Sequence, residues 1–200
     1  MKLHVSAENR APVSPGPLWE VRSSSEIYRN DFFRLRRDAC ALLGAPATKT
    51  DLYVLEMPDC VSIVPITTDQ RVILVEQYRH GIAEHVLECP GGSLVGRCES
   101  LQHAAARELE EETGYRAAEL EYLGAHDPNP GSQTNRTHTF VARGCTASST
   151  QNLESFEDLR VLLVTRCELL DLIRGGARFP SATLASLLLA LASLETPCGP

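Results

Sequence analysis

The stretch GGSLVGRCESLQHAAARELEEETGY, from Gly91 to Tyr115, decides how the rest of the chain is interpreted. Its second half places four carboxylates within five residues, Glu108 and 110–112, and then a glycine, Gly114. Like charges one turn apart on a helix repel by roughly 0.2–0.5 kcal/mol per pair. They also lie at the C-terminal end, where the helix dipole favours cations. The block therefore predicts a compensating positive group, and a divalent metal ion is the first candidate.

Helical geometry sorts these carboxylates. Glu108, Glu111 and Glu112 are related as i, i+3 and i+4 and share one face, whereas Glu110 points elsewhere. Mg²⁺ takes oxygen ligands and commonly keeps waters and substrate phosphates around it. The pattern therefore predicts an Mg²⁺ site, with Mn²⁺ as a substitute. The alternative from the same residues is a solvated acidic helix end that Gly114 caps.

The whole stretch resembles the Nudix box, read as Gly-x5-Glu-x7-Arg-Glu-U-x-Glu-Glu-x-Gly-U, where U is apolar. Residues Arg107 to Tyr115 match its second half position by position, and Glu99 lies eight residues before Arg107 as the box requires. Ser93 stands where the box has its first glycine, directly after Gly91-Gly92. A motif of this length is specific. The shifted glycines predict a loop one residue longer than usual.

Further segments resemble one subgroup of the family, the ADP-ribose pyrophosphatase-like Nudix hydrolases. Residues 75–80, VEQYRH, and 87–92, LECPGG, are similar to its "QYR … E-x-P-x-G" pattern. Residues 128–131, PNPG, resemble its Ser-Pro-Gly-type loop, and 157–161, EDLRV, resemble its closing "E-D-I-x-V" strand. The resemblance spans about Trp19 to Leu194. The order and spacing of these segments together carry it.

The composition limits the classes of function. Hydrophobic residues make up 43% and charged residues 22%, values of an ordinary globular protein. A net charge of −7 argues against partners such as nucleic acid or an anionic membrane. Seven cysteines without CxxC or Cys/His ligand spacing indicate free thiols rather than a zinc site. Because the start of the chain has no signal-peptide pattern and the longest apolar run, 184–194, is too short to span a bilayer, we expect a cytoplasmic protein.

Periodicity and turn residues predict an α/β fold in three parts. We expect a mobile arm at 1–18, a small antiparallel β-domain at 19–57 and a catalytic domain at 58–196. The catalytic domain should contain a mixed sheet covered by helices on both faces. The expected strands are at about 60–67, 71–78, 85–88, 118–123, 138–142 and 158–164. The expected helices are the acidic one, with Ser100 as its N-cap and Gly114 as its C-cap, and those at 166–174 and 182–194. The resemblance implies the same α/β/α sandwich, and a homodimer in which the N-terminal domain is exchanged.

The resemblance also implies roles for the residues of the box. Glu108, Glu111 and Glu112 would bind the metal, together with a backbone carbonyl of the glycine loop, which we assign to Gly92. Arg107 is expected to pair with Glu111 or with Glu99 and so to hold a carboxylate in place rather than touch substrate. Glu99 is either structural or an outer metal ligand.

Substrate contacts are predicted from outside the box. Arg79 could merely end a strand at the surface, but a guanidinium matches phosphate geometry bidentately, and we favour a substrate contact. For Glu88 three roles stay open: a metal ligand, a ribose contact, or a partner of Arg79. Gly131 and Asn135 lie in a polar loop that lines the pocket in relatives, so both are candidate substrate residues.

Two aromatic residues of the N-terminal domain, Tyr28 and Phe32, are more often core residues than stacking platforms. In relatives, however, an aromatic side chain of the exchanged domain stacks on adenine. That makes both Tyr28 and Phe32 candidates for contact with the base.

The predicted activity is metal-dependent hydrolysis of the pyrophosphate bond of ADP-ribose or a related nucleoside-diphosphate sugar. The products would be a nucleoside monophosphate and a sugar phosphate. The general base would be Glu157 or Glu154 on the loop before the last strand, with Glu157 favoured, or the box residue Glu111. The alternatives are hydrolysis of another nucleoside diphosphate derivative, such as a diadenosine polyphosphate or a dinucleotide, and a non-catalytic module that binds nucleotide sugars.

Overall fold

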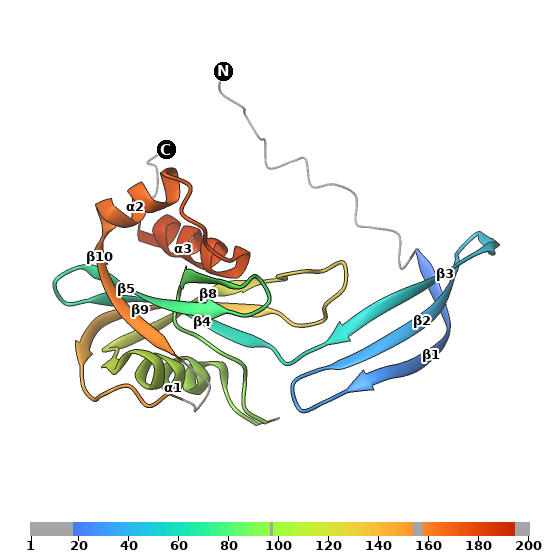
Figure 1. The fold of residues 1–200 in the computed structure, drawn as a ribbon, viewed down its shortest axis with the longest axis horizontal. Helices are drawn as coiled ribbons and strands as arrows, with labels where there is room; N and C mark the ends of the chain where they lie inside the picture. The colour runs from blue at the N-terminus through green and yellow to red at the C-terminus, as the bar shows by residue number, and fades with distance from the viewer. Residues whose placement is uncertain (1–17, 97, 154–157, 195–200) are drawn as a thin grey trace, which may run out of the picture. The chain divides into compact units, whose positions relative to one another are not determined.

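The computed structural model describes residues 18–96, 98–153 and 158–194 of the 200-residue chain. The chain divides into two compact units, with the boundary between Leu55 and Glu56 (Figure 1). Within the described ranges, no helix is both long enough and apolar enough to cross a membrane.

The first unit is a three-stranded antiparallel sheet. Its strands are β1 (Trp19–Arg29), β2 (Arg34–Leu42) and β3 (Ala45–Glu56), in the order β1-β2-β3. Asn30 shapes the β1–β2 turn, because its side-chain oxygen accepts the N–H groups of Phe32 and Phe33 at 2.9 and 2.8 Å. Tyr28 and Phe32 are 53% and 69% exposed. The predicted small antiparallel sheet at the N-terminus is confirmed.

The second unit contains a seven-stranded sheet with the order β10-β5-β4-β9-β7, to which β6 adds beside β5 and β8 beside β9. Strands β4 and β9 run parallel, and the remaining neighbours are antiparallel, so the sheet is mixed. Its strands are β4 (Cys60–Thr67), β5 (Arg71–Arg79), β6 (Glu84–Glu88), β7 (Tyr115–Arg116), β8 (Glu119–His126), β9 (Thr137–Ala147) and β10 (Leu159–Thr165).

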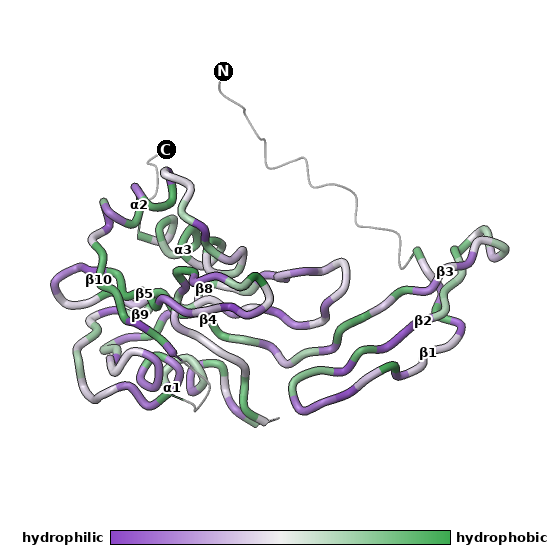
Figure 2. The backbone as a smooth tube through the Cα atoms, viewed as in Figure 1, coloured by the Kyte–Doolittle hydropathy of each residue, from purple (hydrophilic) through white to green (hydrophobic). Residues whose placement is uncertain are grey.

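Helices cover both faces of this sheet: α1 (Leu101–Thr113) lies on one side, and α2 (Arg166–Arg174) and α3 (Ser181–Leu194) lie on the other (Figure 1). Alternation along β4 produces the two cores, because successive side chains of a strand point to opposite faces. Ile63 packs with Ala105 and Leu109 of α1, whereas Val64 packs with Leu187 of α3. Figure 2 shows α3 as almost wholly apolar and α1 as mixed. The predicted α/β/α sandwich is confirmed.

Several predicted element bounds agree closely with the structure. The strand at 60–67 and the helix at 166–174 have the expected ends, and the last helix begins at Ser181. The strands predicted at 118–123 and 138–142 are longer than expected, as β8 and β9. Their antiparallel pairing continues past the apolar residues, where Arg143 and Glu121 form an ion pair at 3.1 Å.

Candidate active site

Helix α1 carries the acidic block, and its two ends are set by local signals. The Ser100 hydroxyl accepts the N–H of His103 at 3.2 Å, and Gly114 adopts the left-handed conformation, φ 74°, with its N–H on the Glu110 carbonyl. Both predicted caps are therefore present. Because Ala104, Ala105 and Leu109 face the sheet, the neighbouring face of the helix is drawn inward. Glu108 and Glu112 on that face are buried, at 9% and 6% exposure.

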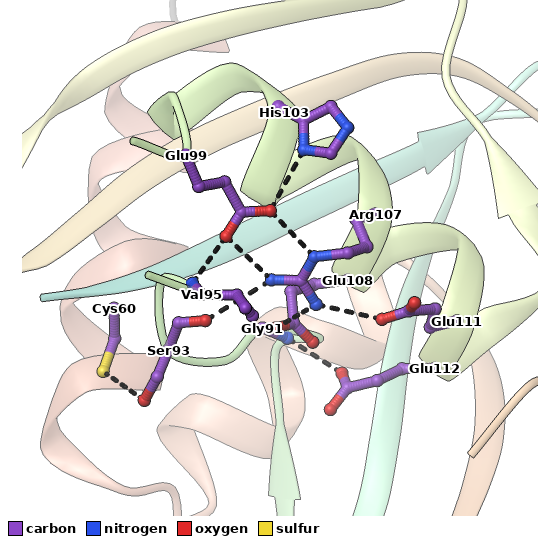
Figure 3. Close-up of polar contacts among 10 residues, drawn as sticks. All are labelled: Cys60, Gly91, Ser93, Val95, Glu99, His103, Arg107, Glu108, Glu111 and Glu112. Carbon is purple, nitrogen blue, oxygen red and sulfur yellow. Dashed lines mark hydrogen bonds and ion pairs between the residues drawn. The ribbon is translucent and has the colours of Figure 1, made fainter. Parts of the chain in front are cut away.

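The glycine loop lies directly against these two buried carboxylates. The Gly91 N–H donates to Oε2 of Glu112 at 2.8 Å (Figure 3). A Cβ atom on Gly92 would lie 2.4 Å from Oε1 of Glu108. The loop is fixed on β4, where Val61 N–H donates to the Gly92 carbonyl at 2.9 Å. Only glycine leaves room for the carboxylates at this distance.

Arg107 is the centre of the charge network beside the loop (Figure 3). Its Nε and Nη2 donate to the two oxygens of Glu99, at 2.9 and 3.2 Å. Its Nη1 donates to Oε1 of Glu108 and to Oε2 of Glu111, both at 2.9 Å. The two predicted partners, Glu99 and Glu111, are thus held at once, because a guanidinium carries five N–H donors in a fixed plane.

Glu99 ties the start of α1 to the loop. In addition to Arg107, its carboxylate accepts the Val95 N–H at 2.7 Å and lies 3.0 Å from Nδ1 of His103. The hydrogen bond from Arg107 is the largest influence on the pKa of Glu99; with the Val95 N–H it outweighs burial and lowers that pKa to about 2. The same bond raises the pKa of Arg107. Two roles were predicted for Glu99, a structural one and that of an outer metal ligand. The contacts described here agree with the structural role.

Ser93, which replaces the first glycine of the box, is accommodated after the Gly91-Gly92 pair. It forms an isolated bridge with Cys60, where the two side chains approach to 3.6 Å, and its carbonyl accepts Arg107 Nη2 at 3.4 Å. The next residue, Leu94, donates its N–H to the Asp59 carbonyl at 3.0 Å. The extra residue of the loop therefore leaves the glycines in contact with Glu108 and Glu112.

The predicted metal ligands are brought together in part. Glu108 and Glu112 meet at the glycine loop, whereas Glu111 is turned to Arg107 and borders an open cavity of about 590 Å³ that Asn152 also lines. In the portion of the chain that the structure describes, no three acidic, His or Cys side chains are already gathered as a metal centre.

The donor chemistry nevertheless suits a hard cation. Glu108 and Glu112 supply anionic oxygens, and the absence of a side chain at Gly92 lets the loop backbone lie against the Glu108 carboxylate. A carboxylate offers about four lone-pair sites and can accept a hydrogen bond and bind a cation at the same time. The carbonyl of Gly92 already accepts Val61 N–H, and its predicted role as a ligand relies on its second lone pair.

Arg79 and Glu88 form a fork-like pair between β5 and β6. Arg79 Nε donates to Oε1 of Glu88 at 2.9 Å, and Nη2 pairs with Oε2. The Glu88 side chain is 9% exposed and that of Arg79 is 49% exposed. Of the three roles left open for Glu88, pairing with Arg79 is therefore present in the structure. The substrate contact of Arg79 stays a prediction. The exposure of the Arg79 side chain, 49%, is compatible with such a contact.

The polar loop before β9 is held by Asp59, a residue that no sequence motif marked as functional. Asp59 accepts the Arg136 N–H at 2.8 Å and contacts Nε2 of His138 at 3.0 Å. These partners lie 77 and 79 residues away, so no local pattern signals them. Next to them Asn135 is 6% exposed, and its Oδ1 is buried without a hydrogen-bond partner. Gly131 is exposed at the turn that Asn129 begins.

For four of the predicted site residues, the structure gives no position relative to the acidic helix and the glycine loop. Glu154 and Glu157, the candidate bases of the loop before β10, lie outside the described residues. Tyr28 and Phe32 belong to the first unit, where their side chains are exposed. Their contacts with substrate stay predictions.

Comparison with known proteins identifies the family. The family model described as the NUDIX domain matches residues 57–181. The ADP-ribose pyrophosphatase of Bacillus subtilis is 29% identical over 162 residues, which cover 80% of this chain and 86% of the relative. The methanol dehydrogenase activator of Bacillus methanolicus is 27% identical over 175 residues, covering 86% and 93%.

The same fold occurs in a solved structure described as an ADP compounds hydrolase. It matches with a TM-score of 0.77 and 22% identity, covering 89% of this chain and 95% of the other. The predicted resemblance to the ADP-ribose pyrophosphatase-like Nudix proteins is confirmed by these matches. Because the domain model covers residues 57–181, well over half of the 200 residues, the chain belongs to the Nudix family.

Proposed function

We propose that the protein hydrolyses the pyrophosphate bond of ADP-ribose or a related nucleoside-diphosphate sugar, giving a nucleoside monophosphate and a sugar phosphate. The observation that carries the proposal is the contact of two buried carboxylates, Glu108 and Glu112, with the glycine loop of the Nudix box. Family membership supports a pyrophosphohydrolase, and a relative named ADP-ribose pyrophosphatase supports this substrate.

The metal would be Mg²⁺, with Mn²⁺ as a substitute. Glu108 and Glu112 would hold it, joined by Glu111 and by the carbonyl of Gly92. When bound, the divalent ion supplies positive charge against the phosphate oxygens and makes water a better nucleophile.

The chain's own groups prepare this arrangement. Arg107 fixes Glu108 and Glu111 through one nitrogen, and the Gly91 N–H fixes Glu112. Glu108 and Glu112 would therefore need little movement to hold the ion, whereas Glu111 would have to turn from Arg107 to join them. The exposed part of Arg79 would bind a substrate phosphate, while Glu88 sets the plane of its guanidinium.

Sugar and ribose recognition would fall to the loop before β9. Asn135 is retained as a candidate substrate residue, but its Oδ1 is buried, so a ribose hydroxyl would reach this acceptor only if the loop moved. Gly131 would let the loop backbone approach the substrate closely.

Proton removal from the attacking water needs a base, and we retain Glu157, Glu154 and Glu111 as its candidates. Glu111 borders the open cavity, which supports its candidacy. The pH–rate profiles of Glu157→Gln and Glu154→Gln will decide between them. If neither variant loses turnover on the alkaline plateau by at least ~10²-fold, the loop does not supply the base.

The proposal extends to assembly and location. We propose a homodimer in which the 19–57 domain is exchanged and its Tyr28 or Phe32 stacks on the base of the substrate, and a cytoplasmic protein without nucleic-acid partners. The exposure of both rings and the net charge of −7 support these points. Light scattering tests the dimer, and a monomeric mass would contradict it.

A substrate panel tests the activity directly. ADP-ribose, other nucleotide sugars, diadenosine polyphosphates and dinucleotides would be incubated with Mg²⁺ or Mn²⁺, with EDTA as the control. We expect the highest kcat/KM on ADP-ribose or another nucleotide sugar. Preferred turnover of a dinucleotide or a diadenosine polyphosphate would change the substrate class. Binding without turnover of any compound would instead identify a non-catalytic module.

A further inference from the structure

The C-terminal end of α1 is held by a segment that follows β9 and lies outside the Nudix box. The last carbonyls of a helix have no partners within the helix. Here the Asn152 N–H donates to the Glu111 carbonyl at 2.8 Å, and Nε2 of Gln151 donates to the Glu112 carbonyl at 2.6 Å. The same segment also holds the Gly114 carbonyl, through the N–H groups of Ser148 and Ser149 at 2.9 and 3.2 Å. Two of the carbonyls that it binds therefore belong to candidate metal ligands, and of these two contacts the one to Glu112 is made by a side chain.

The amide of Gln151 makes a second contact. Its Nε2 also donates to the carbonyl of Leu159 at 3.3 Å, and Leu159 is the first residue of β10. A side-chain amide has two N–H donors, so these two bonds use both. Gln151 thus joins the last turn of the acidic helix to a strand of the central sheet.

From this geometry we propose that Gln151 is a positioning residue for Glu112, an inference that rests on the proposed function. The Glu112 carboxylate accepts the Gly91 N–H, and its main-chain carbonyl accepts the Gln151 amide. Together with the N–H groups of Ser148, Ser149 and Asn152, the Gln151 amide fixes where the helix ends relative to the glycine loop. It thereby contributes to the distance at which the Glu112 carboxylate faces that loop.

The helix does not depend on Gln151 for its existence. Ser100 and Gly114 cap it, and Ala104, Ala105 and Leu109 bury it against the sheet. Losing the amide would therefore loosen the last turn rather than unfold α1. In catalysis a displacement of about 1 Å can cost on the order of 10²-fold in rate. The contribution of Gln151 should accordingly appear in turnover and metal affinity.

The test uses Gln151→Met in the full-length chain, because methionine keeps the length of the side chain and removes both donors. Gln151→Glu places a carboxylate oxygen against the same two carbonyls. Ser149→Ala is the matched control from the same segment, because the Ser149 hydroxyl contacts only the Glu110 carboxylate, which points away from the glycine loop.

Four quantities are measured for each variant: kcat and KM for ADP-ribose at saturating Mg²⁺, the Kd of Mn²⁺ by electron paramagnetic resonance without substrate, and Tm. For Gln151→Met we expect kcat to fall at least ~10-fold, toward the ~10²-fold that such a displacement can cost, with KM changed by less than about three-fold. The Mn²⁺ Kd should rise at least about five-fold, and Gln151→Glu should be worse in both. Ser149→Ala should match the wild type.

A Gln151→Met protein whose kcat and Mn²⁺ Kd stay within about two-fold of the wild type overturns the proposal, whatever its Tm. A wild type that hydrolyses no substrate but binds Mn²⁺ refutes the proposed function alone, since the ratio of Mn²⁺ Kd values still decides the role of Gln151. A wild type that does not bind Mn²⁺ overturns both.

Discussion

Gly92→Ala should separate activity from stability, because the added methyl group meets a functional side chain rather than the backbone. Its Cβ would lie 2.4 Å from Oε1, 2.6 Å from Cδ and 2.8 Å from Oε2 of Glu108. Ordinary van der Waals contact begins at 3.4 Å, so the carboxylate must move by about 1.0 Å, the difference between 3.4 and 2.4. Gly92 has no backbone strain that alanine would worsen.

The size of the loss in stability depends on which atoms must move to make room for the new methyl group. A side-chain torsion displaced by about 30° from its rotamer costs about 0.5–1.5 kcal/mol, so the unfolding free energy should fall by less than about 2 kcal/mol provided that the displaced Glu108 keeps its pair with Arg107. Turnover should fall by on the order of 10²-fold, because Glu108 leaves the glycine loop. Gly91→Ala should behave differently. Its Cβ would lie 2.1 Å from the Val61 carbonyl oxygen, so main chain must shift and stability should drop by about 1–3 kcal/mol or more.

The assay pairs urea denaturation with Mg²⁺-dependent release of a nucleoside monophosphate from ADP-ribose. Gly81→Ala is the control, because a Cβ there meets nothing within 4 Å. A Gly92→Ala protein with turnover within about three-fold of the wild type would show that Glu108 need not lie on the loop. That result would refute the metal assignment of Glu108.

Three further predictions concern single side chains. Glu112→Gln keeps an oxygen for the Gly91 N–H but loses the charge, so Mg²⁺-dependent hydrolysis should disappear while Tm changes little; a folded variant with full turnover would contradict its role as a ligand. Glu99 has a folded-state pKa of about 2, below its usual 4.5, so its stabilisation is full above about pH 4.5 and is lost as pH falls toward 2. Glu99→Gln should therefore be less stable than the wild type by about 1.5–3 kcal/mol at pH 7, with urea midpoints that converge near pH 2. Arg79→Lys keeps the charge but loses the fork, so KM should rise about ten-fold with kcat nearly constant; an unchanged KM would limit Arg79 to holding Glu88.

Much of the site could be read from the sequence because its signals are local. Ser100 and Gly114 cap α1 through neighbours three and four residues away, and helical spacing placed Glu108 and Glu112 on one face. The α/β/α arrangement followed from strands interleaved with helices, and β4, which is buried along nearly its whole length, is covered on both faces as that arrangement requires. These features depend on periods of two and 3.6 residues, which a single sequence displays.

The rest depends on contacts between distant segments. Gln151 reaches Glu112 across 39 residues, and Asp59 reaches Arg136 across 77. Nothing near either residue in the chain marks its partner. The sequence left open whether Arg107 pairs with Glu99 or with Glu111, and in the structure its guanidinium bonds to both. The division between Glu108 and Glu112 at the loop and Glu111 toward the cavity also required coordinates.

The parallel pairing of β4 with β9 has a consequence for how the protein folds. Val61 lies opposite His138 in that register, and the glycine loop and α1 both lie in the chain between them. Closing a loop of this length costs roughly 4 kcal/mol of chain entropy before the pairing returns any energy. Non-local pairing of this kind slows folding, whereas an isolated helix can form within about a microsecond. During refolding, helical signal should therefore precede enzymatic activity, because the acidic helix can form from local contacts, whereas the sheet that supports the site is complete only when the two central strands join.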